Sequence, residues 1–449
     1  MSNLRKDQEK IARVRRLLEM PKAPIRKIIG TLHPTEVALV LEECEEEMQK
    51  SIVRQLPREL ISQAIAEMDE ETNPGELLTL LHPEAAAELV NELEPDDAAD
   101  LLAQISEEHK DSILRHVPRE EKVVINQLLT YDDDTAGGLM NPELVKVQEN
   151  WSTLVALKEV VKQSEEMEAF YAIYVVNDAG QLTGYLTFKA LVLSRKDQQV
   201  QEVMESDVVS VEVNMDQEEV ARKMSQYNLP TLPVVNDNHE LIGRVTFDDI
   251  MDVMEDENTE DILNFAGVSE NASLRGGWAD SVKSRIPWLM VNLMTASLAA
   301  FVISRFEDTL SKIVVITFYM PIIAGVAGNG ATQTLAVTIR RISTDGIPPN
   351  KAVSVILKEV GVGIINGLMI GAIASMIAIA TNSNPMIGLV VFFAMCANLM
   401  IAGLAGSFFP ILLERLGVDP AVASSILITA FTDVIGYILL FGLATLVLL

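Results

Sequence analysis

The stretch Pro420–Leu449, PAVASSILITAFTDVIGYILLFGLATLVLL, decides the fold class of this 449-residue chain. It is longer than the roughly 20 apolar residues that a helix needs to cross a bilayer core, and Asp433 is its one charged side chain. Four further apolar stretches precede it, at Ile286–Ser304, Ile313–Ile339, Gly361–Thr381 and Met386–Leu413. The sequence therefore predicts a membrane domain of five helices over residues 286–449.

The charge of the chain is unevenly distributed. The chain has 35 basic and 64 acidic residues, which gives a formal charge of −29. Residues 286–449 hold seven of each sign, so the whole excess belongs to the first 285 residues. We therefore expect an acidic soluble half joined to the membrane domain. Nucleic-acid binding is excluded because it needs clustered Lys and Arg, whereas this acidity favours cationic partners.

The basic residues that flank the apolar stretches predict how the protein is oriented. They fall on alternate ends of the five stretches, at Lys283, Arg285, Arg340, Arg341, Lys351 and Arg415. Because basic residues are retained on the cytosolic side, we expect the N-terminus inside the cell and, after five crossings, the C-terminus outside. The first residues are charged throughout and lack a signal peptide, which agrees with a cytosolic acidic half. The predicted location is the cell membrane, as a multi-pass protein.

Residues 1–130 are expected to form an acidic domain of short helices. Leu32-His33-Pro34 returns as Leu81-His82-Pro83, and Leu56-Pro57-Arg58-Glu59 returns as Val117-Pro118-Arg119-Glu120. Prolines near helix starts and repeated segments favour an α-helical solenoid. An ordinary helical bundle in which the repeated tripeptide is coincidental is the alternative.

Two α/β repeats are predicted next, at residues 131–203 and 204–254. Tyr174–Phe188 and Pro233–Phe247 match at eight of 15 positions, and each reads as strand, Asn-Asp turn, strand and helix start. They resemble a tandem pair of CBS domains, which often bind adenine nucleotides such as ATP. Thr246 and Asp249 of the second repeat could bind a ribose, whereas Ala190 replaces the acid in the first. The alternative is that Thr246 only caps a helix.

An acidic linker helix is expected over residues 255–285, between the second repeat and the membrane domain. Its first part, Glu255–Asp261, is rich in carboxylates, and Ile250, Val253 and Met254 mark an apolar stripe that leads into it. Gly276–Gly277 is a point at which such a helix can break.

Asp433 is the strongest candidate for a functional residue in the membrane domain. It lies 13 residues after Pro420, so it is about 20 Å along the last helix and close to mid-bilayer. A carboxylate there costs at least about 2.5 kcal/mol unless it meets water, a cation or a partner. Ser425, Thr429, Thr432 and Gly436 fall on the same helical face. This face is predicted to line a pore, with helix packing as the alternative for the hydroxyl residues.

The second apolar stretch is irregular in the middle. Gly325, Gly328 and Asn329 follow Pro321, and Gln333 lies one turn beyond Asn329. Glycines alone would indicate close helix packing. Because polar side chains accompany them, we predict that Gly325, Gly328 and Asn329 belong to the pore.

The order of these parts, together with Tyr131–Met140, Thr259–Asp261, Gly328–Asn329 and Thr432–Val434, resembles the MgtE family of magnesium channels. The resemblance implies a homodimer with its pore at the interface, in which Asp433 binds hydrated Mg²⁺. It also implies that cytosolic Mg²⁺ closes the channel. The regulatory acids of the family fall on Asp96, Asp100, Asp134, Asp216, Glu218, Asp249, Asp252, Glu257, Glu260 and Asp261.

Two other classes of function were considered. An intramembrane metalloprotease needs HExxH, but the five histidines all lie outside the apolar stretches, so an enzyme is not expected. An exchanger that couples Mg²⁺, Mn²⁺ or Co²⁺ to Na⁺ or H⁺ stays open, since a mid-membrane Asp also serves proton relays. Mg²⁺ is usually held by one or two carboxylates through retained water, and this favours the channel.

Overall fold

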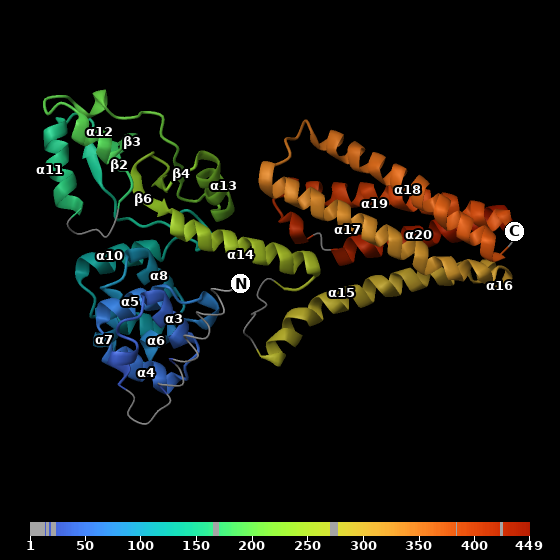
Figure 1. Ribbon diagram of the computed structural model, residues 1–449, viewed down its shortest axis with the longest axis horizontal. Helices are drawn as coiled ribbons and strands as arrows, with labels where there is room; N and C mark the ends of the chain where they lie inside the picture. The colour runs from blue at the N-terminus through green and yellow to red at the C-terminus, as the bar shows by residue number, and fades with distance from the viewer. Residues whose placement is uncertain are drawn as a thin grey trace. The chain divides into compact units, whose positions relative to one another are not determined.

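The computed structural model describes residues 14, 18, 24–164, 170–269, 277–382, 384–422 and 425–449. The chain divides into two compact units, Met1–Glu255 and Asp256–Leu449, and the division falls within one helix, α14 (Phe247–Ala266). The first unit contains short helices and two small sheets, and the second contains long helices (Figure 1). The predicted fold class, which combines helical, α/β and membrane-spanning parts, is confirmed.

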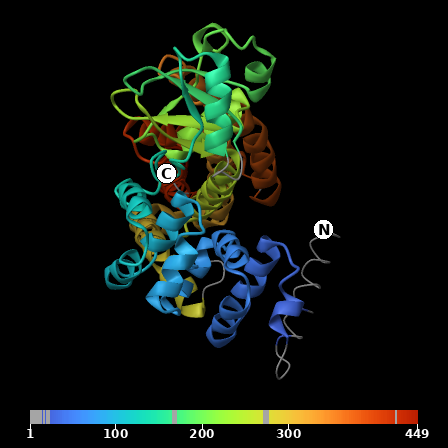
Figure 2. The same ribbon diagram turned by 90° about the vertical axis from the view of Figure 1, so that its left-hand side faces the viewer.

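Short helices fill the N-terminal part of the first unit and gather in one bundle (Figure 2). The repeated tripeptides mark helix starts: His33 and His82 are N-caps, and the prolines that follow them occupy the first helical turn. Pro57 and Pro118 stand before the other two repeated helices. The helices are α2 (Ile25–Ile28), α3 (Pro34–Glu42), α4 (Glu46–Gln55), α5 (Arg58–Ala66), α6 (Glu76–Thr79), α7 (Pro83–Val90), α8 (Pro95–Ala103), α9 (Glu107–Leu114) and α10 (Arg119–Leu128).

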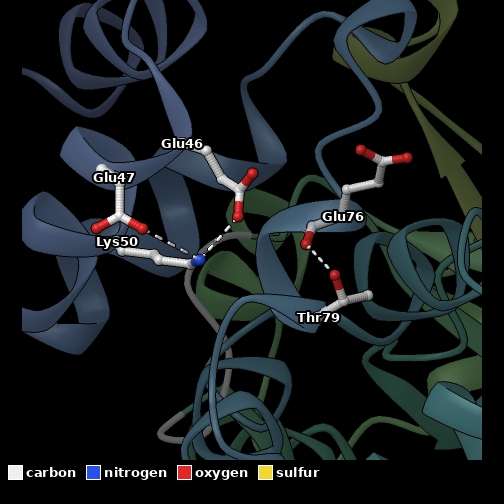
Figure 3. Close-up of polar contacts among 5 residues, drawn as sticks. All are labelled: Glu46, Glu47, Lys50, Glu76 and Thr79. Carbon is white, nitrogen blue, oxygen red and sulfur yellow. Dashed lines mark hydrogen bonds and ion pairs between the residues drawn. The ribbon is translucent and has the colours of Figure 1, made fainter.

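Some acidic side chains of this bundle form ion pairs with a residue of the same helix. Lys50 Nζ lies 2.7 Å from Glu46 Oε1 and 3.7 Å from Glu47 Oε1, while Thr79 Oγ1 donates to the Glu76 carbonyl at 2.7 Å (Figure 3). Exposed ion pairs between neighbouring turns contribute little to stability. The bundle is therefore held together by its buried apolar side chains, which include Ile29, Leu41, Ile52, Ile61 and Leu102.

Two three-stranded sheets follow and have the same topology. The first contains β1 (Lys146–Gln148), β2 (Ile173–Val176) and β3 (Leu182–Leu186), with α11 (Thr153–Ser164) and α12 (Phe188–Leu193). The second contains β4 (Val211–Glu212), β5 (Thr231–Val235) and β6 (Leu241–Thr246), with α13 (Gln217–Tyr227). In each, a parallel pair is followed by an antiparallel pair whose register shifts before Val176 or Val235. The same irregularity at matching positions confirms the predicted duplication.

Five helices of the second unit are long and apolar enough to cross a membrane. They are α15 (Trp278–Ser304), α17 (Met320–Asp345, extended at its start by a 3-10 turn from Val314), α18 (Ala352–Asn382), α19 (Pro385–Arg415) and α20 (Ser425–Leu448), with the short α16 (Glu307–Lys312) between the first two (Figure 1). Glycines let α18 and α19 approach closely, because a Cβ on Gly363 would lie 2.4 Å from the Leu399 carbonyl oxygen. Helix α19 also packs against α17 and α20.

The linker differs from the expectation in its helix boundaries. The acidic helix α14 already begins at Phe247 and ends at Ala266, because Gly267 adopts a left-handed φ of +71°. The first membrane helix begins at Trp278, ahead of the predicted Ile286, and the Gly277 N–H donates to Asp280 Oδ2 at 3.0 Å. Its first turns carry Lys283 and Arg285, so hydropathy alone places the start too late. Gly276 lies outside the described residues.

Candidate ion-binding sites

A cavity of about 220 Å³ lies in the membrane unit between α15 and α20. Three of its polar side chains, Ser425, Thr429 and Asp433, are spaced four residues apart on α20 and so share one face. The described lining residues include no Lys, Arg or His: they are Asn292, Thr295, Ala296, Ala299, Ser425, Ile426, Thr429, Ala430 and Asp433. The cavity thus presents a carboxylate that no basic side chain in its wall neutralises.

One carboxylate oxygen of Asp433 makes no hydrogen bond within the described residues. Its Oδ1 is buried and has no hydrogen-bond partner in the described part of the chain. Leaving a buried acceptor unsatisfied costs about 1–3 kcal/mol, and more when the group is charged. A cation with its water in the cavity would supply both the missing hydrogen bonds and the missing positive charge. The donor set, a carboxylate with two hydroxyls, suits a hard divalent ion.

Part of the predicted polar face of α20 is buried against other parts of the membrane unit, and part lines the cavity. Thr432 is fully buried and its Oγ1 donates to the Thr429 carbonyl at 2.9 Å, while Gly436 packs against Asn398 of α19. Side chains of consecutive residues diverge by about 100° on a helix, so Thr432 and Asp433 stand at opposite edges of the face. Thr432 and Gly436 therefore serve helix packing, whereas Asp433 lies in the cavity.

The predicted pore residues of α17 are not brought together in a single chain. Gly328 is buried against α20, since a Cβ there would lie 2.9 Å from Thr429 Cγ2. Gly325, Asn329 and Gln333, each one turn after the last, are exposed. They form a polar strip on the outside of an apolar helix. In a bilayer such a strip needs water or another protein surface over it.

The C-terminal end of α14 packs on the membrane helices within the second unit. Ser425 Oγ donates to the Phe265 carbonyl at 3.1 Å, and Asn264 Nδ2 lies 3.3 Å from Glu260 Oε1 and 3.5 Å from Asp419 Oδ2. Burial and the nearby Asp419 raise the pKa of Asp261, and Arg340 counteracts this shift. One hydroxyl of the cavity is thereby bonded to the acidic helix.

A second group of carboxylates lies in the first unit, where the start of α8 meets the start of α14. Burial, followed by the charges of Asp249 and Glu94, raises the pKa of Asp97 to about 7. Burial also raises the pKa of Asp249 to about 6, even though hydrogen bonds from Thr246 lower it. The pKa of Asp96 is raised well above its usual value, first by burial and then by neighbouring carboxylates. These acids are costly to ionise together because they are buried and their carboxylates lie near one another.

The surroundings of this carboxylate group are also polar. The Asn141 side-chain amide donates to Asp96 Oδ1 at 3.2 Å and to Glu94 Oε2. Burial, with Glu255, Glu67 and Asp248 nearby, raises the pKa of Asp252. In the described ranges, however, no three His, Cys, Asp or Glu side chains converge on one point closely enough to hold a metal ion. The group is an electrostatic cluster without a formed coordination site.

The other predicted regulatory acids lie outside this carboxylate group. Asp216 caps α13, since its Oδ1 accepts from the Glu218 N–H at 2.9 Å. The Gln217 N–H donates to the Asp134 carbonyl at 2.9 Å, which brings Asp134 next to this cap. Asp100 is exposed on α8, and Glu257 lies on α14 beyond the first carboxylate group. Asp134, Asp216 and Glu218 thus form a second acidic location, on the second α/β repeat.

The proposed nucleotide residues are bonded to each other. Asp249 Oδ2 accepts from Thr246 Oγ1 at 2.5 Å and from the Thr246 N–H at 3.2 Å. Asp249 therefore accepts from the N–H that precedes the helix, as the third residue of a capping box does, while the Thr246 hydroxyl donates to Asp249 and does not act as the helix cap of the alternative interpretation. A ribose hydroxyl would have to displace or share this contact.

Comparisons with known proteins cover both halves of the chain. Three family profiles match: a divalent cation transporter (MgtE) over residues 320–443, an MgtE intracellular N domain over 32–134, and a CBS domain over 136–196 and 200–256. The magnesium transporter MgtE of Bacillus subtilis is 33% identical over 325 residues, and that of Thermus thermophilus is 34% identical over 326; each alignment covers 72% of both chains. The chain belongs to the MgtE family. As an MgtE-family protein it is a membrane transporter and not an enzyme.

Two solved structures resemble part of this MgtE-family chain. The soluble part of a magnesium transporter is 27% identical, with a TM-score of 0.49, and the match covers 56% of this chain and 99% of that one. The cytosolic domain of the Mg²⁺ channel MgtE in complex with ATP is 31% identical, with a TM-score of 0.48. The match covers 51% of this chain and 93% of that one.

Several residues of these sites escaped the sequence analysis. Asn292 and Thr295, on the first membrane helix of this MgtE-family chain, line the cavity that contains Asp433. Their spacing of three residues in an apolar stretch was the available signal, since it places both on one helical face. Glu94 and Asp97 belong to the carboxylate cluster, and the acidic run Glu94–Asp97 at a helix start was the corresponding signal.

Proposed function

We propose that this MgtE-family protein conducts Mg²⁺ across the cell membrane and that Asp433 binds the ion with part of its water shell. The observation that carries the proposal is the buried, unpartnered Oδ1 of Asp433 in a polar cavity. Mg²⁺ gives up its water reluctantly and is usually bound by one or two carboxylates. The hydroxyl of Thr429 can hold the remaining water. The direct test is Mg²⁺ entry into proteoliposomes, compared between the wild type and Asp433→Asn.

We propose a homodimer, which the exposed strip of α17 supports. Gly325, Asn329 and Gln333 would face lipid in a single chain. A two-fold axis beside α17 and α20 would cover this strip with its own copy and would bring two Asp433 side chains towards one pathway. Gly325 and Asn329 then line the pore at the dimer interface, whereas the predicted Gly328 lets α17 pack closely against α20 beside it.

The proposed orientation places the acidic unit in the cytosol and the C-terminus outside. The ends of α15, α17 and α19 that carry Arg285, Arg340 and Arg415 lie on the cytosolic side. The end of α14 bonds to Ser425 at the start of α20, which is on the same side in this topology.

We further propose that cytosolic Mg²⁺ closes the channel by binding the acidic residues. The raised pKa values of Asp97 and Asp249 support this, because burial, followed by the charges of neighbouring carboxylates, makes both groups costly to ionise. A divalent ion between them would relieve the repulsion and draw their helices together. The candidate ligands are Asp96, Asp100, Asp134, Asp216, Glu218, Asp249, Asp252, Glu257, Glu260 and Asp261.

Helix α14 offers a route from these acids to the pore. It is continuous from Phe247 to Ala266, so Asp249 lies near one end and Phe265 near the other. The Phe265 carbonyl accepts the Ser425 hydroxyl, which lines the cavity. A displacement of α14 therefore acts directly on the start of α20.

The carboxylate cluster should make closure depend on pH. A carboxylate whose pKa is raised in the compact state favours that state at low pH, and this contribution is lost as pH rises through the raised pKa. Without Mg²⁺, we expect protease protection of the cytosolic unit to fall as pH rises from about 4, the ordinary pKa of an aspartate, to about 7, the raised pKa of Asp97; Asp249 contributes to this fall up to about pH 6. Saturating Mg²⁺ should restore protection at pH 8. Equal protection at pH 5.5 and pH 8 without Mg²⁺ would contradict this role of the cluster.

ATP is proposed as a second cytosolic ligand at Thr246 and Asp249. If Asp249 serves both a ribose and the Mg²⁺-bound closed state, ATP must shift the Mg²⁺ concentration needed for closure, and Mg²⁺ must shift the affinity for ATP by the same factor. Calorimetric titration of the purified protein with ATP, with and without Mg²⁺, measures both effects. Absence of heat at millimolar ATP in both conditions would leave Thr246 and Asp249 as a helix cap alone.

A further inference from the structure

We infer that Asn292 and Thr295 of α15 hold the water shell of the ion at Asp433, so that the first membrane helix forms one wall of the ion site and sets its selectivity. This inference rests on the proposed function, because it assigns new residues to the same site. It adds α15, which the sequence analysis treated as an apolar span.

The cavity has two polar walls. Helix α20 provides Ser425, Thr429 and Asp433, and α15 provides Asn292 and Thr295. The other α15 lining residues, Ala296 and Ala299, are small and leave space between the helices. A Mg²⁺ ion with six waters has a radius of about 3.5 Å, from a metal–oxygen distance of about 2.1 Å and a water radius of about 1.4 Å, and so occupies roughly 180 Å³. The cavity of about 220 Å³ is therefore similar in volume to the hydrated ion.

The amide of Asn292 has no evident structural task. It lies six residues, about 9 Å, beyond Ile286, where the apolar part of α15 begins. Its side chain makes no hydrogen bond to another residue in the part of the chain that the structure describes. An amide without a hydrogen-bond partner in hydrocarbon costs several kcal/mol. Facing a hydrated ion, its oxygen accepts from water and its NH₂ donates to water.

Thr295 is positioned to complete this wall. Its Oγ1 donates to the Asn292 carbonyl at 2.9 Å, so the oxygen keeps lone pairs that can accept from water in the cavity. The apolar side chains of α15 lie elsewhere on the helix: Leu293 and Met294 are 59% and 71% exposed and do not line the cavity. The two polar side chains are therefore confined to the face that meets Asp433.

Such a wall would select ions by the size and rigidity of their water shell. Mg²⁺ keeps a compact octahedral shell, whereas Ca²⁺ takes six to eight ligands at longer distances and exchanges them more readily. Hydrogen bonds from two opposite walls fix the distance at which the shell must fit. Removing the α15 wall should therefore weaken apparent Mg²⁺ affinity and relax discrimination against Ca²⁺, more than it lowers the maximal rate.

The first test compares Asn292→Ala, Thr295→Val and the double variant with Ser297→Ala in proteoliposomes. Ser297 is a matched control, since it lies on the same helix, donates to the Leu293 carbonyl at 2.7 Å and does not line the cavity. We expect the double variant to raise the half-saturating Mg²⁺ concentration about tenfold and to raise Ca²⁺ entry relative to Mg²⁺, while Ser297→Ala behaves as the wild type. Unchanged half-saturation and unchanged Ca²⁺ discrimination in the double variant would overturn the inference.

The second test does not depend on transport. In a background of Cys44→Ser and Cys396→Ala, Asn292→Cys should react with a charged, water-soluble thiol reagent, and Mg²⁺ should slow the reaction at least about fivefold. Leu293→Cys, which points away from the cavity, should show no slowing by Mg²⁺. Reaction of Asn292→Cys that Mg²⁺ leaves unchanged, in a protein that still conducts Mg²⁺, overturns the role of α15 and leaves the proposed function intact. A wild type that conducts no Mg²⁺ overturns the proposed function instead.

Discussion

Asp433→Asn should lower the rate of Mg²⁺ entry into proteoliposomes at least about a hundredfold. The amide keeps the size of the side chain but removes the one negative charge among the described cavity residues, and a hundredfold loss corresponds to about 2.7 kcal/mol. Folding should be retained, because Asp433 Oδ1 has no protein partner in the described ranges to lose. The measurement is the initial rate of Mg²⁺ entry, read from an enclosed fluorescent indicator.

Asp308→Asn is the matched control for this substitution. It makes the same chemical change at an exposed position on α16 that does not line the cavity, so it should leave the rate unchanged. Both variants should elute from a sizing column as the wild type does. A wild-type rate for Asp433→Asn would show that the carboxylate does not bind the ion.

The second large effect is expected from the cytosolic acids. Asp249→Asn combined with Glu257→Gln should raise the internal Mg²⁺ concentration that closes the channel about tenfold. Each substitution removes a ligand for Mg²⁺, and we expect this loss to outweigh the accompanying loss of repulsion, which by itself would favour closure. A tenfold change corresponds to about 1.4 kcal/mol. The measurement is open probability against internal Mg²⁺ in excised patches.

Asp237→Asn serves as the control for the cytosolic variant, since this acid is exposed in the turn between β5 and β6, away from α14 in the sequence. It should leave the closing midpoint unchanged. If the double variant closes at the same Mg²⁺ concentration as this control, Asp249 and Glu257 are solvated acids without a role in gating.

The parts of the fold that could be predicted from the sequence are those that depend on residues close together in the chain. The prolines after His33 and His82 begin helices because of their fixed φ angle, and the duplicated Asn-Asp turns reproduce the same strand order in both repeats. The five apolar helices have 24 to 31 residues, enough to cross a bilayer core. Asp433 was identifiable because a charge in such a stretch has few structural explanations.

The parts that the sequence did not predict depend on contacts between distant segments. Asn292 and Asp433 line one cavity because α15 packs against α20, and no local pattern encodes that pairing. The charge of Asp249 raises the pKa of Asp97 for the same reason. The end of α14 at Gly267 follows from one left-handed backbone angle, which the acidic run before it does not signal.

The most direct test of the central proposal is Mg²⁺ flux driven by a Mg²⁺ gradient alone. Wild-type protein is reconstituted in liposomes with equal Na⁺ and equal pH on both sides and with the membrane voltage clamped. Conduction through a pore at Asp433 predicts saturable Mg²⁺ entry under these conditions and no change when a Na⁺ or pH gradient is added. Entry that appears only when a Na⁺ or proton gradient is imposed would contradict the channel and identify a coupled exchanger.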